Sequence, residues 1–84
     1  MNTLTDQSRA AAIAANLDVL RLRLSIAATH VAEACAAMAA GQQNLAIGTI
    51  FDLEQTLPEC DALLRATLVL HRMRALTVQE GGAA

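Results

Sequence analysis

The sequence predicts an all-α antiparallel helical hairpin that pairs into a dimeric four-helix bundle. Nineteen of the 84 residues are Ala and thirteen are Leu, both strong helix formers, whereas the residues that favour strands are sparse. Apolar residues recur every three or four positions on both sides of a central turn. The chain is also 55% hydrophobic, with a mean hydropathy of +0.39, which is more apolar surface than one small domain buries alone.

The first helix is expected over residues 7–40, about 50 Å long. Thr5 or Ser8 can cap its start, and Asp6 suits the positive end of the helix dipole. One unbroken stripe with three-and-four spacing predicts the face that packs on the second arm. The stripe consists of Ala10, Ile13, Leu17, Leu20, Leu24, Ala27, Val31, Ala34 and Met38.

A tight turn is expected over residues 41–44, with Gly41 as the C-cap of the first helix and Asn44 as the N-cap of the next. A short connection places the second helix, residues 45–76, antiparallel beside the first. Folding the chain about residue 42 sets Ala34 opposite Ile50, a small residue against a larger one. The inward stripe of the second arm is Ala46, Ile50, Leu53, Leu57, Cys60, Leu64 and Thr67.

Pro58 interrupts the second arm, because a proline inside a helix removes one hydrogen bond and clashes with the carbonyl four residues earlier. The arm is therefore expected to be kinked near residues 56–58 or divided there. Residues 77–84 end in Gly-Gly-Ala-Ala and are expected to form a disordered tail. The whole chain, residues 1–84, forms a single domain.

Each arm carries a second apolar line, which a lone hairpin would leave exposed. We expect this line to bind a partner, and pairing of two hairpins into a homodimer would bury it best. A different helical partner and a monomeric three-helix bundle with a corner at Pro58 or Asn16 are the alternatives. The expected partner-binding residues are Val19, Leu22, Ile26, Phe51, Leu63, Ala66, Leu70 and Met73, with Ile47 near the turn.

Composition and motifs argue against several functions. The net charge is −2 with a pI near 5.5, whereas nucleic-acid binders carry a basic face. A DNA-binding accessory regulator stays as the alternative function, with phosphate contacts from Arg21, Arg23, Arg72 and Arg74. The polar turn inside the uncharged stretch of residues 34–51 argues against a membrane span. Two Cys and no signal-peptide pattern indicate a cytoplasmic protein with free thiols.

Catalysis is not expected, because the chain has no phosphate-binding glycine loop, CxxC motif or catalytic triad spacing. The enzymatic alternative would need His30, Glu33 and Glu54 to meet around a metal, but a polar rim explains these three residues better. His71 suits the negative end of a helix. Cys35 and Cys60 are too far apart in this hairpin to pair, and they lack an activating base. The sequence therefore predicts no cofactor and no metal site.

The chain resembles the small helical-hairpin co-chaperones of bacterial type III secretion. The shared features are the size, the Asn2-Thr3-Leu4-Thr5 start, two arms about a Gly41-Gln42-Gln43-Asn44 turn, and an apolar second arm ending in Leu70-His71-Arg72. The similarity is architectural and covers most of the chain. It implies a bacterial, cytoplasmic, non-enzymatic protein whose hydrophobic face shields another helix.

Overall fold

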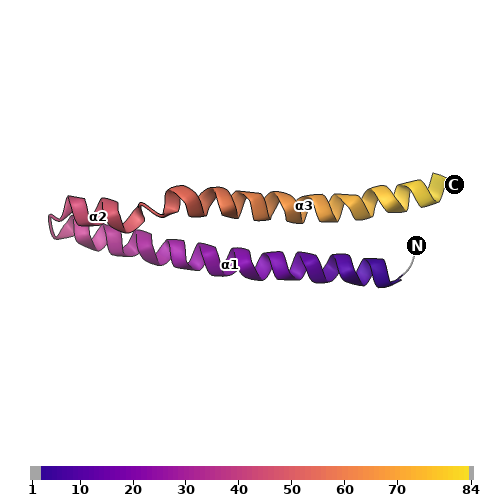
Figure 1. Cartoon of the computed structure of the whole chain (residues 1–84), viewed down its shortest axis with the longest axis horizontal. Coiled ribbons are helices and arrows are strands. Elements are labelled where there is room, and N and C mark those ends of the chain that lie inside the picture. The colour runs from indigo at the N-terminus through magenta and orange to yellow at the C-terminus, as the bar shows by residue number, and fades with distance from the viewer. Residues whose placement is uncertain (1–2, 84) are drawn as a thin grey trace.

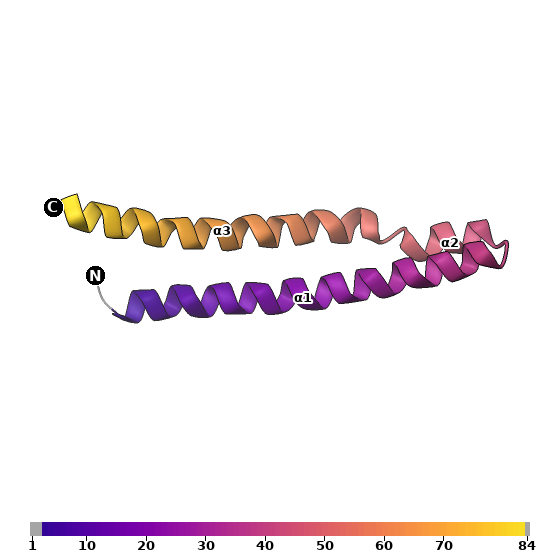
Figure 2. The ribbon, with the colours of Figure 1, turned by 180° about the vertical axis from the view of Figure 1, so that it is seen from behind.

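The structure is a computed structural model that describes the backbone of residues 3–83 and the side chains of residues 5–73. It contains three helices, α1 (Thr3–Ala39), α2 (Gln43–Ile50) and α3 (Leu53–Ala83), and no strand among the described residues. α1 forms one arm, and α2 and α3 follow each other along it to form the second arm (Figures 1 and 2). The predicted all-α helical hairpin is thus confirmed.

The hairpin is long and thin. It measures 65 × 18 × 15 Å, and its radius of gyration is 19.1 Å, against about 12 Å for a compact domain of this length. Its accessible surface of 6213 Å² exceeds the roughly 4,800 Å² typical of a folded monomer of this mass. These dimensions exclude the compact three-helix bundle. In the described part of the chain, no helix has both the length and the apolar content needed to cross a membrane.

Gly41 ends α1, as predicted, in the left-handed conformation with φ +77°. The Gly41 amide donates to the Met38 carbonyl at 2.9 Å and the Gln42 amide to the Ala37 carbonyl at 2.8 Å, which together form a Schellman motif. Because these two bonds complete the reversal of chain direction, α2 begins already at Gln43. Its N-cap is Gln42 rather than Asn44. The turn is therefore shorter than the expected residues 41–44.

The second arm is interrupted at Phe51 and Asp52, not near residues 56–58 as expected. A new helix starts there because the Asp52 carbonyl accepts the amides of Gln55 at 3.1 Å and Thr56 at 3.0 Å, and Asp is a favoured N-cap residue. Pro58 then lies inside α3, where it deprives the Glu54 carbonyl of its helical donor. The arm is divided upstream of the proline and stays helical through it.

Both ends of the hairpin are more helical than expected. α1 begins at Thr3 rather than at residue 7. α3 continues to Ala83, where a disordered tail over residues 77–84 was expected; Ala84 lies outside the described residues. No proline follows Pro58, and each residue added to an existing helix closes one more backbone hydrogen bond, which outweighs the low helix propensity of Gly81 and Gly82.

The contact between the arms is made by small side chains. Ala34, Ala37 and Ala46 form a buried cluster beside the turn, with Ile50 packed against it. Further along, the buried residues are Ala27, Cys60 and Thr67. No large side chain is fully buried among the described residues. The helices therefore approach closely but bury little apolar surface between them.

Candidate interaction surface

The inward face of α1 follows two lines with heptad spacing. The first line is Ile13, Leu20, Ala27 and Ala34, and the second is Arg9, Asn16, Arg23, His30 and Ala37. These residues are buried or half-buried, and Ala12 is half-buried beside them. The first line agrees with the predicted stripe. The rest of that stripe does not face the second arm: Ala10, Leu17, Leu24, Val31 and Met38 are exposed, and the residue directly before each of them faces inward instead.

The second arm shows the same shift. Ala46, Ile50, Leu53, Cys60 and Thr67 face α1 as predicted, whereas the expected inward residues Leu57 and Leu64 are exposed. Thr56 and Leu63 take their places, and Leu70 continues this inward line. Leu63 and Leu70, which were expected to bind a partner, are thus half-buried against α1.

The inward face of each arm is rotated by about 50° from the predicted one, since neighbouring residues on a helix are about 100° apart. Ala37 and Ala46 account for this rotation at the turn, because their small side chains let the two backbones approach where Met38 would hold them apart. Farther along, Arg23 and His30 can face inward because a long or amphipathic side chain buries its stem and keeps its polar end near water.

This rotation leaves a row of large apolar side chains outside the hairpin, which we name the leucine face. Each member directly follows a buried or half-buried residue of its own arm, and each is 45–53% exposed. None carries a charge. The leucine face consists of Leu17, Leu24, Val31 and Met38 on α1, Ile47 on α2, and Leu57 and Leu64 on α3.

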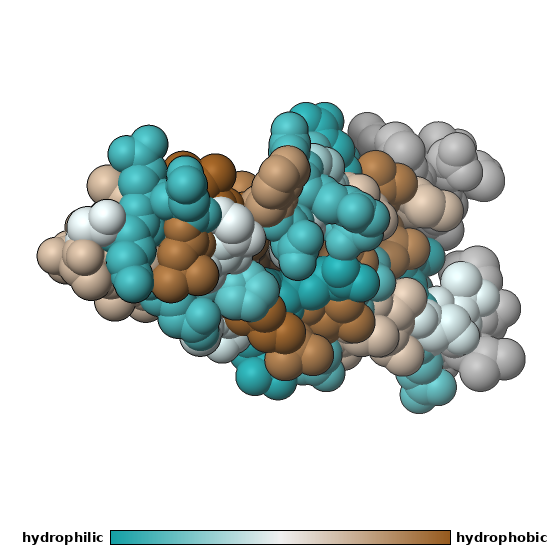
Figure 3. All heavy atoms as spheres, turned by 60° about the vertical axis from the view of Figure 1, so that its left-hand side comes forward, coloured by the Kyte–Doolittle hydropathy of each residue, from teal (hydrophilic) through white to brown (hydrophobic). Residues whose placement is uncertain are grey.

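These seven residues lie on one side of the hairpin. Along each arm they are displaced from the inward face in the same rotational sense, and in two antiparallel helices the same sense leads to the same side. The surface view shows brown, hydrophobic side chains of both arms reaching solvent between hydrophilic ones (Figure 3). The apolar surface that the sequence analysis assigned to the core is therefore available to a partner.

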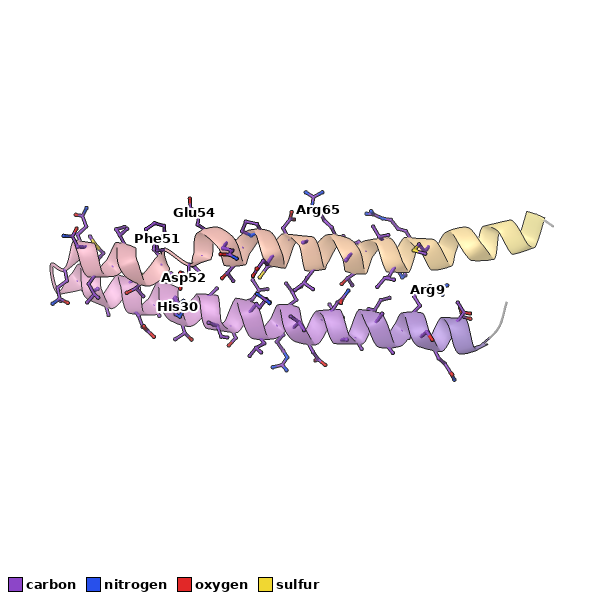
Figure 4. The ribbon with its side chains drawn as sticks, in the orientation of Figure 1. Arg9, His30, Phe51, Asp52, Glu54 and Arg65 are labelled. Carbon is purple, nitrogen blue, oxygen red and sulfur yellow. The ribbon has the colours of Figure 1, made fainter. Side chains whose placement is uncertain are left out.

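The other side of the hairpin carries an ion pair between the two arms. There Arg23 Nη1 donates to Glu59 Oε1, and both side chains are part-exposed. Val19 and Ile26, which precede inward residues of the first line, and Ala66, which precedes the buried Thr67, lie on this side and are exposed, as is Met73 on α3. Leu22, 56% exposed, points farther outward on the same side, and Phe51, 66% exposed, lies where α2 ends (Figure 4). A partner covering this side would have to remove water from a charged pair, which is costly.

The residues considered for metal binding do not come together. His30 lies on the side of α1 that faces the second arm, whereas Glu54 points away from α1 (Figure 4). Among the described residues no group of three possible ligands surrounds a common point. The His30 Nδ1 atom is buried without a hydrogen-bond partner in the described structure. The geometry therefore supplies no metal-binding set with His30, Glu33 and Glu54.

The arginines considered for DNA binding are separated as well. Arg21 is 78% exposed and lies 4.0 Å from Asp18, but Arg23 faces the second arm and pairs with Glu59. Arg72 is exposed on α3, and the side chain of Arg74 lies outside the described residues. Two neighbours in sequence thus point to different sides of α1, and the Arg21/Arg23 pair forms no basic patch.

The two cysteines occupy different environments. Cys60 is buried between the arms, whereas Cys35 is exposed on α1 beside the leucine face. Both are free thiols, in agreement with the prediction that they do not pair within the hairpin. A comparison of the chain with models of protein families, with curated proteins and with solved structures finds no match.

Proposed function

We propose that this chain is a non-enzymatic protein–protein interaction module, a small helical chaperone or adaptor that works as a self-associating hairpin. The observation that carries the proposal is the leucine face, seven large apolar side chains half-exposed on one side of the hairpin. Covering one half-exposed side chain of this size contributes about 1 kcal/mol, so a row of seven favours association strongly.

The composition of the contact between the arms supports the same conclusion. Among side chains 5–73 the buried residues are four Ala, one Cys and one Thr, and alanine burial contributes little hydrophobic free energy. A hairpin held together by such a contact gains most of its stability from further packing of its helices. Two hairpins that pair into a four-helix bundle supply this packing.

The proposal is tested by the mass of the full-length chain in solution. Sedimentation equilibrium at micromolar concentrations is expected to give a multiple of the 8.8 kDa chain mass, with the dimer as the main species. Circular dichroism on the same samples is expected to show a predominantly helical protein. A soluble, helical monomer over the whole concentration range would contradict the proposed function.

A further inference from the structure

We infer that the occupant of the leucine face is a second copy of this chain, placed so that α1 of each copy packs on α3 of the other. The inference rests on the proposed function and adds to it the face, the partner and the relative orientation. The two-fold axis of this dimer runs parallel to the long axis of the hairpin. Each residue therefore lies at the same height, meaning the same position along that axis, as its equivalent in the partner.

The register within one hairpin shows which residues of α1 and α3 lie at the same height. Arg23 pairs with Glu59, and because the arms are antiparallel, Leu24 lies close in height to Leu57, and Leu17 to Leu64. In the proposed dimer Leu24 therefore packs on the partner's Leu57, and Leu17 on the partner's Leu64. Because the dimer is symmetric, each of these two pairs forms twice, once with the α1 residue of each copy. The leucines therefore form two layers between the hairpins, as a self-complementary interface requires.

Charge selects this orientation. Arg21 and Asp61 border the leucine face, Arg21 on α1 and Asp61 on α3, and the Arg23–Glu59 register puts them at the same height. Stacking α1 on the partner's α3 brings Arg21 to the partner's Asp61 and forms two equivalent ion pairs. Both side chains are well exposed in the single hairpin, 78% for Arg21 and 55% for Asp61, and each also has a charged neighbour on its own helix, Asp18 at 4.0 Å and Arg65 at 2.8 Å.

In the opposite orientation, in which α1 packs on the partner's α1, the second copy offers these charges no counter-charge. The residues that share the line of Arg21 on α1 are Gln7, Ala14, Ala28 and Cys35, none of which is acidic. Glu54, Asp61 and Leu68 share the corresponding line on α3, and none of them is basic. That orientation would give Arg21 and both carboxylates no counter-charge from the partner, so that only the pairs within each helix, Arg21–Asp18 and Arg65–Asp61, would remain at the edge of the interface.

The size of the face suits a second copy. It runs about 32 Å from Leu17 to Met38 at 1.5 Å per residue, and the hairpin is 18 Å wide. The projected area is roughly 600 Å², of the same order as the roughly 800 Å² that each partner contributes to a standard stable interface. A hairpin of the same length and width covers the face completely.

Two matched substitutions of the full-length chain test the face. Leu24→Glu places a charge in the leucine face and is expected to raise the dimer dissociation constant at least about 100-fold. Leu22→Glu is the control, two residues away and 56% exposed on the other side against 45% for Leu24, and is expected to change the constant less than about threefold. Sedimentation equilibrium measures both, and circular dichroism shows whether each variant remains helical.

A charge exchange tests the orientation. Arg21→Glu and Asp61→Arg are each expected to weaken the dimer about tenfold, and the double variant to return it to within about threefold of the wild type. Asp61 also accepts a hydrogen bond from Arg65 of its own chain at 2.8 Å. Arg21 likewise lies 4.0 Å from Asp18 of its own chain. Since each single substitution breaks its own intrahelical pair, and the double variant breaks both, recovery can come only from the exchanged pair between copies.

The outcomes separate the two proposals. A monomeric wild-type chain overturns the proposed function and this inference together. A wild-type dimer that Leu22→Glu dissociates and Leu24→Glu does not overturns the face alone. A dimer that depends on Leu24 but shows no recovery in the double charge variant overturns the orientation. If Leu24→Glu loses its helicity, the charge exchange, which leaves the apolar residues unchanged, decides the inference by itself.

Discussion

The ion pair between Arg23 and Glu59 joins α1 to α3 across 36 positions of the sequence. The other charged pairs among the described side chains are local, between residues three or four apart on one helix. Arg23–Glu59 thus marks the register of the two arms directly. It also makes one side of the hairpin polar, while the opposite side carries the leucine face.

Removing this ion pair is expected to cost little stability. The two side chains are 42% and 43% exposed, so solvent screens their attraction, and a double-mutant cycle with Arg23→Ala and Glu59→Ala is expected to give a coupling of at most about 1 kcal/mol. Urea unfolding at one fixed protein concentration measures it, since stability and association are linked. A coupling several times larger would show that the pair is shielded from water.

The two central glycines are expected to respond in opposite ways to alanine. Gly41→Ala must hold φ near +77°, which costs about 1 kcal/mol for a residue with a Cβ. Gly48→Ala sits in α2, where an added Cβ meets nothing within 4 Å, and is expected to stabilise by about 0.5–1 kcal/mol. Thermal unfolding of both variants checks the signs. Equal effects would contradict the left-handed cap at Gly41.

The small side chains near the turn are expected to be necessary for the close approach of the arms. Ala46 is 2% exposed, and Ala46→Leu would push α2 away from Ala34 and Ala37 at a cost of about 1–3 kcal/mol. Ala36→Leu, on the exposed part of α1, is the control and is expected to stay within about 0.5 kcal/mol of the wild type. Denaturant unfolding compares them. A neutral Ala46→Leu would mean that the turn has room for a larger residue.

Pro58→Ala is expected to stabilise α3 without joining it to α2. The substitution restores an amide that can donate to the Glu54 carbonyl, and it is expected to raise the free energy of unfolding by about 2 kcal/mol. The interruption at Phe51 and Asp52 should remain, because the Asp52 carbonyl starts the next helix. Amide hydrogen exchange tests this. Protection of the Phe51 and Asp52 amides in Pro58→Ala equal to that of the α3 interior would assign the interruption to the proline.

Local features of the sequence were sufficient to predict the hairpin. Ala and Leu favour helix without any tertiary contact. Gly41 ends α1 because only a residue without a Cβ takes the left-handed conformation at little cost. The position of the second interruption was not predictable in the same way. Pro58 is the stronger helix breaker in isolation, but the hydrogen bonds that start α3 form at Asp52.

The candidate site was predicted only in part. A second apolar surface was expected, but its expected members included Leu63 and Leu70, which pack against α1, and omitted Leu17 and Leu24, which do not. The signal that could have corrected this was the line of small residues at the turn. Ala34, Ala37 and Ala46 favour a closer approach than a stripe that contains Met38 allows.

The sequence by itself therefore determined two antiparallel helical arms and an excess of apolar residues over what they can bury. Only the tertiary structure decided which of two overlapping stripes faces inward. Both stripes contain Ile13, Leu20, Ala27 and Ala34. Periodicity cannot separate the two stripes, because the residues three and four positions after each of these lie on either side of the same helix face. Close packing at the turn separates them: on α1 it selects the small and polar line and leaves Leu17, Leu24, Val31 and Met38 outside.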